Sequence, residues 1–285
     1  MTTNPFKNNV KPNWCPGCGH YGTHNSLQQA LQQLNFKPQD VAIISGIGCA
    51  GRISGYIYAY GVHTTHGRAL PFAQGVKLAN PELEVIACGG DGDGFAIGLG
   101  HALHAIKRNI NMTYILMDNH VYGLTKGQTS PRSDLGFKTK TTPKGNVENP
   151  LPALEMVLAA GATFVGQAFA AQGAELVDLI KQAIAHKGFS FINVLTPCVT
   201  FNKVNTYEWY KENIIPISSL LNYDSHNRLQ AFQAVAENRG LITGLIYQDI
   251  SKTNYEKAVG LEDNNKISSI EHLAMADCLE LLKEF

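Results

Sequence analysis

The sequence predicts an α/β protein with a doubly wound, mostly parallel sheet, and three observations lead to this class. Short apolar runs typical of buried strands alternate along the chain with amphipathic stretches, which is the pattern of parallel strands joined by helical crossovers. Several of these runs stop at glycine-rich turns, as strands do at the ligand-binding edge of such sheets. The chain has 285 residues, 44% of them hydrophobic, so it can bury a full core.

The first half of the chain begins with a predicted helix and continues with strands and helices in alternation. Leu27 and Leu31 share one face of a helix over 23–36. Predicted strands follow at 41–45, 84–88 and 112–117, and predicted helices at 71–79 and 96–107. Residues 123–150 show no convincing period, and a loop of that length in a compact domain is usually functional or disordered.

Regular alternation resumes in the second half of the chain. Helices are predicted at 151–160 and 172–186, and strands at 163–168 and 189–195. Residues after 198 are less regular, with predicted helices near 226–238 and 270–282 and a strand at 241–247. Because no linker rich in Gly, Ser or Pro interrupts the chain, we expect an N-terminal arm (1–22), a main domain (23–200) and a C-terminal extension (201–285) packed on the same core.

Composition excludes several classes of protein. Basic and acidic residues balance at 23 each, which argues against a nucleic-acid-binding surface of the usual basic kind. No apolar run approaches the roughly 20 residues needed to cross a membrane. The first residues, MTTNPFKNNVKPNW, contain no apolar signal sequence, so we expect a cytoplasmic protein. In that reducing compartment, the six cysteines are better interpreted as metal ligands or buried thiols than as disulfides.

Polar residues with ligand chemistry follow two of the predicted strands. Asp91 lies in the glycine-rich turn 89–94, and Asn119 follows the next strand 28 residues later. Parallel strands end at one edge of a sheet, so both side chains are expected at the ligand-binding edge. Carboxylate and amide oxygens suit Mg²⁺, which commonly takes phosphate oxygens as further ligands. The glycines and the following helix start favour a diphosphate nearby.

Four cysteines are predicted to meet at the same edge. Cys15 and Cys18 form a C-x-x-C pair, while Cys49 and Cys198 each lie in a turn after a predicted strand. Four converging thiolates can hold an iron–sulfur cluster or a structural zinc, and the spacing leaves both open. The other two, Cys88 in a strand and Cys278 in a helix, are expected to pack in the core.

Together these motifs resemble the β subunits of 2-oxoacid:ferredoxin oxidoreductases, thiamine-diphosphate enzymes that include the pyruvate and 2-oxoglutarate forms. The matching stretches are WCPGCGHYG (14–22), SGIGCAGR (45–52), HTTHGRALPFAQGVKLANP (63–81), GGDGDGFAIGLGH (89–101), DNHVYGLTKGQTSP (118–131) and TPCVTFN (196–202). They occur in order over about two-thirds of the chain. A Gly-Asp-Gly triplet followed at this distance by asparagine is the usual thiamine-diphosphate signature, and the four cysteines make the resemblance more specific.

The resemblance implies a thiamine-diphosphate-binding fold in the main domain, with Mg²⁺ bound by Asp91, Asn119 and the backbone carbonyl of Val121. It implies that thiamine diphosphate is lined by Ile47, Gly48, Cys49, Ala50, Gly92, Asp93, Gly123 and Leu124. It also implies one 4Fe–4S cluster close to the cofactor, ligated by Cys15, Cys18, Cys49 and Cys198.

Further candidates for contact with substrate or cofactor are cations and their neighbours. Arg52 lies three residues after Cys49 and is a candidate for the substrate carboxylate, where a guanidinium can bind in bidentate fashion. The stretch His66, Gly67 and Arg68 is a candidate for contact with the diphosphate or the substrate carbonyl, with an ordinary structural turn as the equal alternative. Lys126 is a candidate for an anionic substrate or phosphate, with an exposed loop lysine as the alternative.

The resemblance also implies that this polypeptide carries half of an active site. Thiamine enzymes need a glutamate from a second αβ domain, which this chain lacks, and in the family that residue and the coenzyme A site belong to an α subunit. We therefore expect an αβ or α₂β₂ assembly that decarboxylates a 2-oxoacid oxidatively to acyl-CoA and CO₂ and passes electrons to ferredoxin.

Two other functions remain open at this point. The first is a non-oxidative thiamine-diphosphate decarboxylase whose cysteines bind structural zinc. The second is a non-catalytic metal-binding scaffold that retains the fold. Each leaves either the cysteines or the Asp91 motif without a function.

Overall fold

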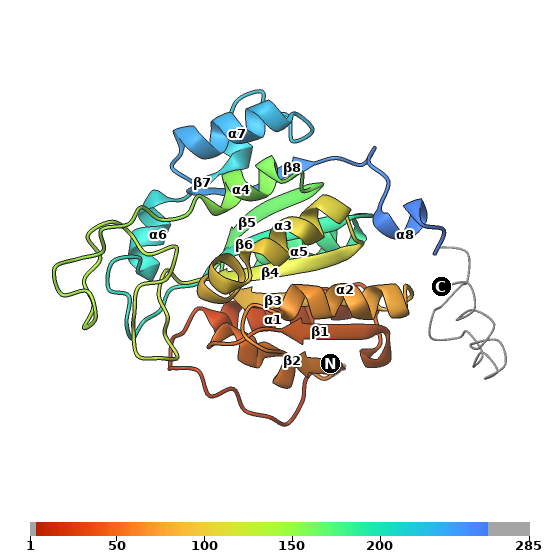
Figure 1. Ribbon diagram of the computed structural model, residues 1–285, viewed down its shortest axis with the longest axis horizontal. Coiled ribbons are helices and arrows are strands. Elements are labelled where there is room, and N and C mark those ends of the chain that lie inside the picture. Colours follow the sequence, from red (N-terminus) through yellow and green to blue (C-terminus); the bar gives the residue numbers. More distant parts are fainter. Residues whose placement is uncertain (1–3, 262–285) are drawn as a thin grey trace, which may run out of the picture.

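In the computed structural model, which describes residues 4–261, helices cover both faces of one twisted sheet (Figure 1). The strands are β1 (Val41–Ser45), β2 (Tyr60–His63), β3 (Glu84–Gly90), β4 (Met112–Asp118), β5 (Phe164–Phe169), β6 (Phe189–Leu195), β7 (Ile215–Pro216) and β8 (Ile242–Gln248). Their order across the sheet is β2-β1-β3-β4-β6-β5-β8-β7. Neighbours from β2 to β5 are parallel, and β8 pairs antiparallel with β5. The predicted fold class is therefore confirmed.

The helices form two layers around this sheet. They are α1 (His20–Gln33), α2 (Ala69–Ala79), α3 (Leu99–Arg108), α4 (Ala153–Ala159), α5 (Gly173–Ala185), α6 (Tyr207–Asn213), α7 (Arg228–Glu237) and α8 (Tyr255–Ala258). One hydrophobic cluster contains buried residues of α1 and α5, and a second contains those of α2, α3, α4 and α7. The two layers thus bury opposite faces of the sheet, as a doubly wound fold requires.

The central strands are apolar on both faces because both faces are covered. Every residue of β4, β5 and β6 is buried, which explains why these strands appear in the sequence as continuous apolar runs. Along β3, Val85 and Ala87 join one cluster while Ile86 and Cys88 join the other. Cys88 is completely buried, in agreement with its expected packing role.

Several local features differ from the expectation. The edge strand β2 was not predicted, since it has four residues, contains a glycine and is largely exposed. The helix expected from Ala96 begins instead with a π-helical turn over Asp93–Ile97, in which the Gly98 amide donates to the Asp93 carbonyl at 3.0 Å. Such turns interrupt helices frequently at functional sites. α6 and α8 were also not predicted, and the helix expected at 270–282 lies outside the described residues.

The C-terminal extension joins the main sheet through β7 and β8, and α7 packs against α4. The boundaries at 22 and 200 stay predictions. Between β4 and α4 no helix or strand forms over 119–152, all of which the structure describes. This long segment lies beyond the carboxyl ends of the parallel strands, at the left in Figure 1.

Candidate functional site

Asp91 and Asn119 lie where two neighbouring strands end. Gly90 of β3 is paired with Met117 of β4, so the chain leaves both strands at the same edge. Asp91 is 2% exposed and Asn119 is 8% exposed. Both line a cavity of about 150 Å³, here called the Asp91 cavity.

Most residues predicted to contact a cofactor line this same cavity. They are Ile47, Gly48, Cys49, Ala50, His66, Asp91, Gly92, Asp93, Asn119, Val121, Gly123 and Leu124. Gly67 and Arg68 do not line it. The Arg68 guanidinium instead donates to the carbonyl of Gly67 at 3.2 Å and to that of Ile97 at 3.5 Å. The cofactor roles of these two residues stay predictions.

Asp93 connects three segments around the cavity. Its Oδ1 accepts hydrogen bonds from the Ile47 amide at 2.9 Å, the Gly67 amide at 2.8 Å and His66 Nδ1 at 2.8 Å. Bonds to an ionised acceptor are about twice as strong as neutral ones. Gly46 is needed beside it, because a Cβ there would lie 1.8 Å from Asp93 Oδ2. Asp93 therefore holds the loops around the cavity together, a role that its place in the motif did not reveal.

The environment of Asp91 suits a bound cation. The Ser130 hydroxyl donates to Asp91 Oδ2. Burial, together with the nearby Asp118 carboxylate, raises the pKa of Asp91 to about 7. Asn119 Oδ1 accepts from the Val121 amide at 3.1 Å, and an amide oxygen has two lone pairs. A desolvated carboxylate beside a second carboxylate, with an amide oxygen lining the same cavity, fits a divalent cation.

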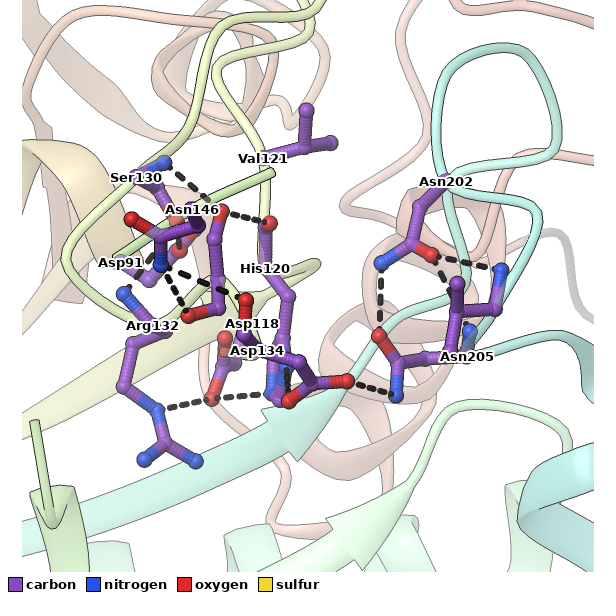
Figure 2. A network of polar contacts seen from close by, with 12 residues as sticks. Asp91, Asp118, His120, Val121, Ser130, Arg132, Asp134, Asn146, Asn202 and Asn205 are labelled. Atoms are coloured by element: carbon purple, nitrogen blue, oxygen red, sulfur yellow. Dashed lines mark hydrogen bonds and ion pairs between the residues drawn. The ribbon is translucent and has the colours of Figure 1, made fainter. Parts of the chain in front are cut away.

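A charged network centred on the buried Asp118 lies beneath this site (Figure 2). Arg132 Nε donates to Asp118 Oδ2 at 3.0 Å, and His120 lies between Asp118 and Asp134, with N–O distances of 3.4 and 3.6 Å. Burial opposes charge on Asp118, but His120 and Arg132 hold the pKa of that carboxyl well below its usual range. Burial likewise opposes charge on His120, yet the two carboxylates raise its pKa to about 9.

Sequence reasoning assigned no role to the residues of this network. Ser130 and Asp118 lie within a motif that was recognised, but their contacts cross 39 and 14 residues, to Asp91 and Arg132 respectively. The only signal in the sequence for these contacts would have been a hydroxyl side chain and a cationic side chain shortly after the Asp91 and Asn119 motifs. The network supports the segment that carries Asn119 and Val121.

The four predicted cysteines line a second cavity, here called the cysteine cavity, of about 300 Å³. Its lining includes Cys15, Cys18, Cys49, Cys198, Arg52 and Lys126. Cys49, Asn119, Gly123 and Leu124 line both cavities. The two cavities therefore share a wall.

The thiols surround the cysteine cavity and do not converge on a single point. Among the residues that the structure describes, no group of three or more His, Cys, Asp or Glu side chains could hold one metal ion. A Cβ on Gly123 would lie 3.5 Å from Cys49 Sγ and 3.8 Å from Cys198 Sγ. Burial, with a smaller effect of the neighbouring thiols, raises the pKa of Cys18 to about 12.

Comparison with known proteins identifies the family. Residues 46–194 match the family described as the thiamine pyrophosphate enzyme, C-terminal TPP binding domain. Residues 198–262 match the family that describes the C-terminal part of the pyruvate ferredoxin oxidoreductase beta subunit. The chain is 47% identical to the 2-oxoacid:ferredoxin oxidoreductase subunit beta of Saccharolobus solfataricus over 213 residues, 74% of this chain and 70% of the relative. The chain belongs to the family of 2-oxoacid:ferredoxin oxidoreductase β subunits.

Two further similarities agree with this membership. The β subunit is 44% identical to the 2-oxoglutarate synthase subunit KorB of Methanocaldococcus jannaschii over 188 residues, 66% of this chain and 70% of the relative. Its structure is similar to that of the 2-oxoglutarate:ferredoxin oxidoreductase from Magnetococcus marinus, with a TM-score of 0.89 and 39% identity over 98% of this chain and 96% of that one. That protein was solved with 2-oxoglutarate, coenzyme A and succinyl-CoA bound.

The resemblance expected from the motifs is confirmed, and the β subunit is part of an oxidoreductase that contains a thiamine-diphosphate-binding domain. The helices in residues 4–261 are all too short or too polar to span a membrane.

Proposed function

We propose that this β subunit, together with an α subunit, catalyses the coenzyme A-dependent oxidative decarboxylation of a 2-oxoacid to acyl-CoA and CO₂. The reaction uses thiamine diphosphate, and electrons pass one at a time through a 4Fe–4S cluster to ferredoxin. The observation that carries this proposal is the shared wall of Cys49, Asn119, Gly123 and Leu124 between the Asp91 cavity and the cysteine cavity. Thiamine diphosphate as the electron donor and the cluster as the one-electron acceptor would lie next to each other across this wall.

The Asp91 cavity is the proposed site of thiamine diphosphate and Mg²⁺. Asp91, Asn119 and the Val121 carbonyl would bind the metal, which suits its preference for oxygen ligands. Thiamine diphosphate, when bound, stabilises the negative charge left by decarboxylation. His66 lines the cavity with Nδ1 held by Asp93, so Nε2 is the ring nitrogen available to a ligand.

The cysteine cavity fits an iron–sulfur cluster better than zinc. Tetrahedral zinc with Zn–S bonds of about 2.3 Å requires sulfur atoms about 3.8 Å apart. The described residues contain no such compact group, although all four thiols line one cavity. A cluster distributes its four ligands over four iron atoms and so needs a wider ring of thiols.

Arg52 and Lys126 are the proposed contacts of the substrate. Both are exposed side chains that line the cysteine cavity, next to the wall that it shares with the Asp91 cavity. Arg52 would bind the 2-oxoacid carboxylate, and Lys126 a second anionic group. Coenzyme A and the second wall of the site would come mainly from the α subunit, and the proposed location of the enzyme is cytoplasmic.

The proposal is tested with the anaerobically purified α–β complex. We expect four iron and four sulfide per β subunit, and viologen reduction with coenzyme A and one member of a panel of 2-oxoacids. Zinc with CO₂ release but no viologen reduction would instead indicate a non-oxidative decarboxylase.

The Asp91→Ala variant tests the thiamine-diphosphate site separately. We expect it to lose Mg²⁺-dependent cofactor binding, measured by calorimetry, while the exposed control Asp178→Asn keeps it. Unchanged binding in Asp91→Ala would favour the scaffold function.

A further inference from the structure

One buried histidine lines the cysteine cavity and has none of the functions proposed above. His20 is the first residue of α1, is 1% exposed and lines the cavity beside the four cysteines. Its Nδ1 lies 3.4 Å from Cys18 Sγ. Its Nε2 is buried and has no hydrogen-bond partner among the described residues.

The surroundings hold the imidazole of His20 in this position. The Trp14 ring packs against it with a centroid distance of 5.6 Å. The Trp14 indole in turn donates to the Cys49 carbonyl at 2.7 Å. The His20 ring therefore contacts the Cys18 side chain and a Trp14 ring that is itself bonded to the backbone of Cys49.

Chemistry decides which ring nitrogen carries the hydrogen when Cys18 is a ligand. A neutral imidazole has one N–H, on either Nδ1 or Nε2. A ligating thiolate can only accept a hydrogen bond. A hydrogen on Nε2 would leave a buried donor without a partner and direct the Nδ1 lone pair at the sulfur. A hydrogen on Nδ1 satisfies both the ring and the thiolate.

Cys18 is the thiolate within reach of this donor, and the His20 backbone amide hydrogen-bonds the same sulfur, a contact that every variant at position 20 retains. Cys15 is exposed, so water can solvate its sulfur, whereas Cys18, like Cys49 and Cys198, is partly buried. Hydrogen bonds to cluster sulfurs stabilise the reduced, more negative state and are one of the terms that set the reduction potential.

We propose that His20 Nδ1–H donates a hydrogen bond to the Cys18 thiolate and raises the reduction potential of the cluster, making His20 a positioning and tuning residue. This inference rests on the proposed function, because it requires the cluster in the cysteine cavity.

The test compares amide replacements at position 20 in the anaerobic α–β complex. Asn places its side-chain Nδ2 where His20 has Nδ1, whereas Gln carries its amide one carbon further. The readout is the potential of the cluster, followed by electron paramagnetic resonance during a redox titration. His24→Gln is the control, since His24 lies one turn along α1 and also packs against Trp14.

We expect His20→Asn and His24→Gln to keep the wild-type potential. In His20→Gln, we expect the ratio of reduced to oxidised cluster at the wild-type midpoint to fall about tenfold, equivalent to about 59 mV for one electron. Equal potentials in His20→Asn and His20→Gln would overturn the inference and leave the proposed function intact. A wild-type complex without iron and sulfide would overturn both.

Discussion

His66 Nδ1 lies 2.8 Å from Asp93 Oδ1, and this hydrogen bond joins the turn after β3 to the segment before α2. The same oxygen accepts the Ile47 amide, which follows β1. One carboxylate oxygen thus determines the relative positions of three segments that line the Asp91 cavity. Asp93, two residues after the proposed metal ligand Asp91, therefore maintains the shape of the candidate site.

Asp93→Asn is expected to weaken binding of thiamine diphosphate with Mg²⁺ by about tenfold. The amide keeps the shape of the side chain, but neutral hydrogen bonds replace charge-assisted ones, which are roughly twice as strong. Calorimetric titration measures the affinity, with Asp178→Asn at an exposed ion pair as the control. Wild-type affinity in Asp93→Asn would contradict the anchoring role.

Gly46→Ala is expected to destabilise the protein by about 1–3 kcal/mol and to weaken cofactor binding. A Cβ at position 46 would lie 1.8 Å from Asp93 Oδ2, so the carboxylate must move. Gly55→Ala is a matched control, because a Cβ there meets nothing within 4 Å. Urea unfolding of both variants measures the difference, and equal stabilities would show that the packing around Asp93 is not constrained.

Ser130→Ala is expected to weaken Mg²⁺ binding by about 10- to 100-fold, the usual effect of removing a hydrogen bond to a metal ligand. The lost bond is the one that Ser130 donates to Asp91 Oδ2. Titration of Mg²⁺ at saturating thiamine diphosphate measures the change. Ser219→Ala, at an exposed serine, should leave the affinity unchanged, and a similar loss in both variants would rule out a specific role for Ser130.

Glu84→Gln is expected to stabilise the protein at pH 8 by on the order of 2 kcal/mol and to have little effect at pH 4. Burial raises the pKa of Glu84 to about 7, despite the opposing charges of Lys77 and Lys187. The unfolded chain loses this proton near pH 4.3. Between about pH 4.3 and 7 the folded state therefore binds more protons, and stability falls as the pH rises.

Urea unfolding at the two pH values measures this effect, with the exposed Glu148→Gln as the control. A variant less stable than wild type at pH 8 would show that the attraction between Glu84 and Lys77 outweighs the cost of burying the charge.

The sequence by itself determined the α/β class, most strands and helices, the Asp91–Asn119 pair and the four cysteines. These features are local: β1 and β6 were predicted with their observed bounds because buried parallel strands are continuous apolar runs between turns. Because parallel strands end at the same edge of a sheet, residues distant in sequence could then be predicted to lie together.

Only the tertiary structure decided how these residues are supported. Three features depend on which buried polar atoms find partners. They are the anchoring role of Asp93, the hydrogen bond from Ser130 to Asp91, and the contact of His20 with Cys18. Such partners come from segments that are distant in sequence, and any serine, histidine or aspartate could supply them. Periodicity records which residues are buried, but the satisfaction of buried hydrogen-bonding groups depends on distances that only the folded chain establishes.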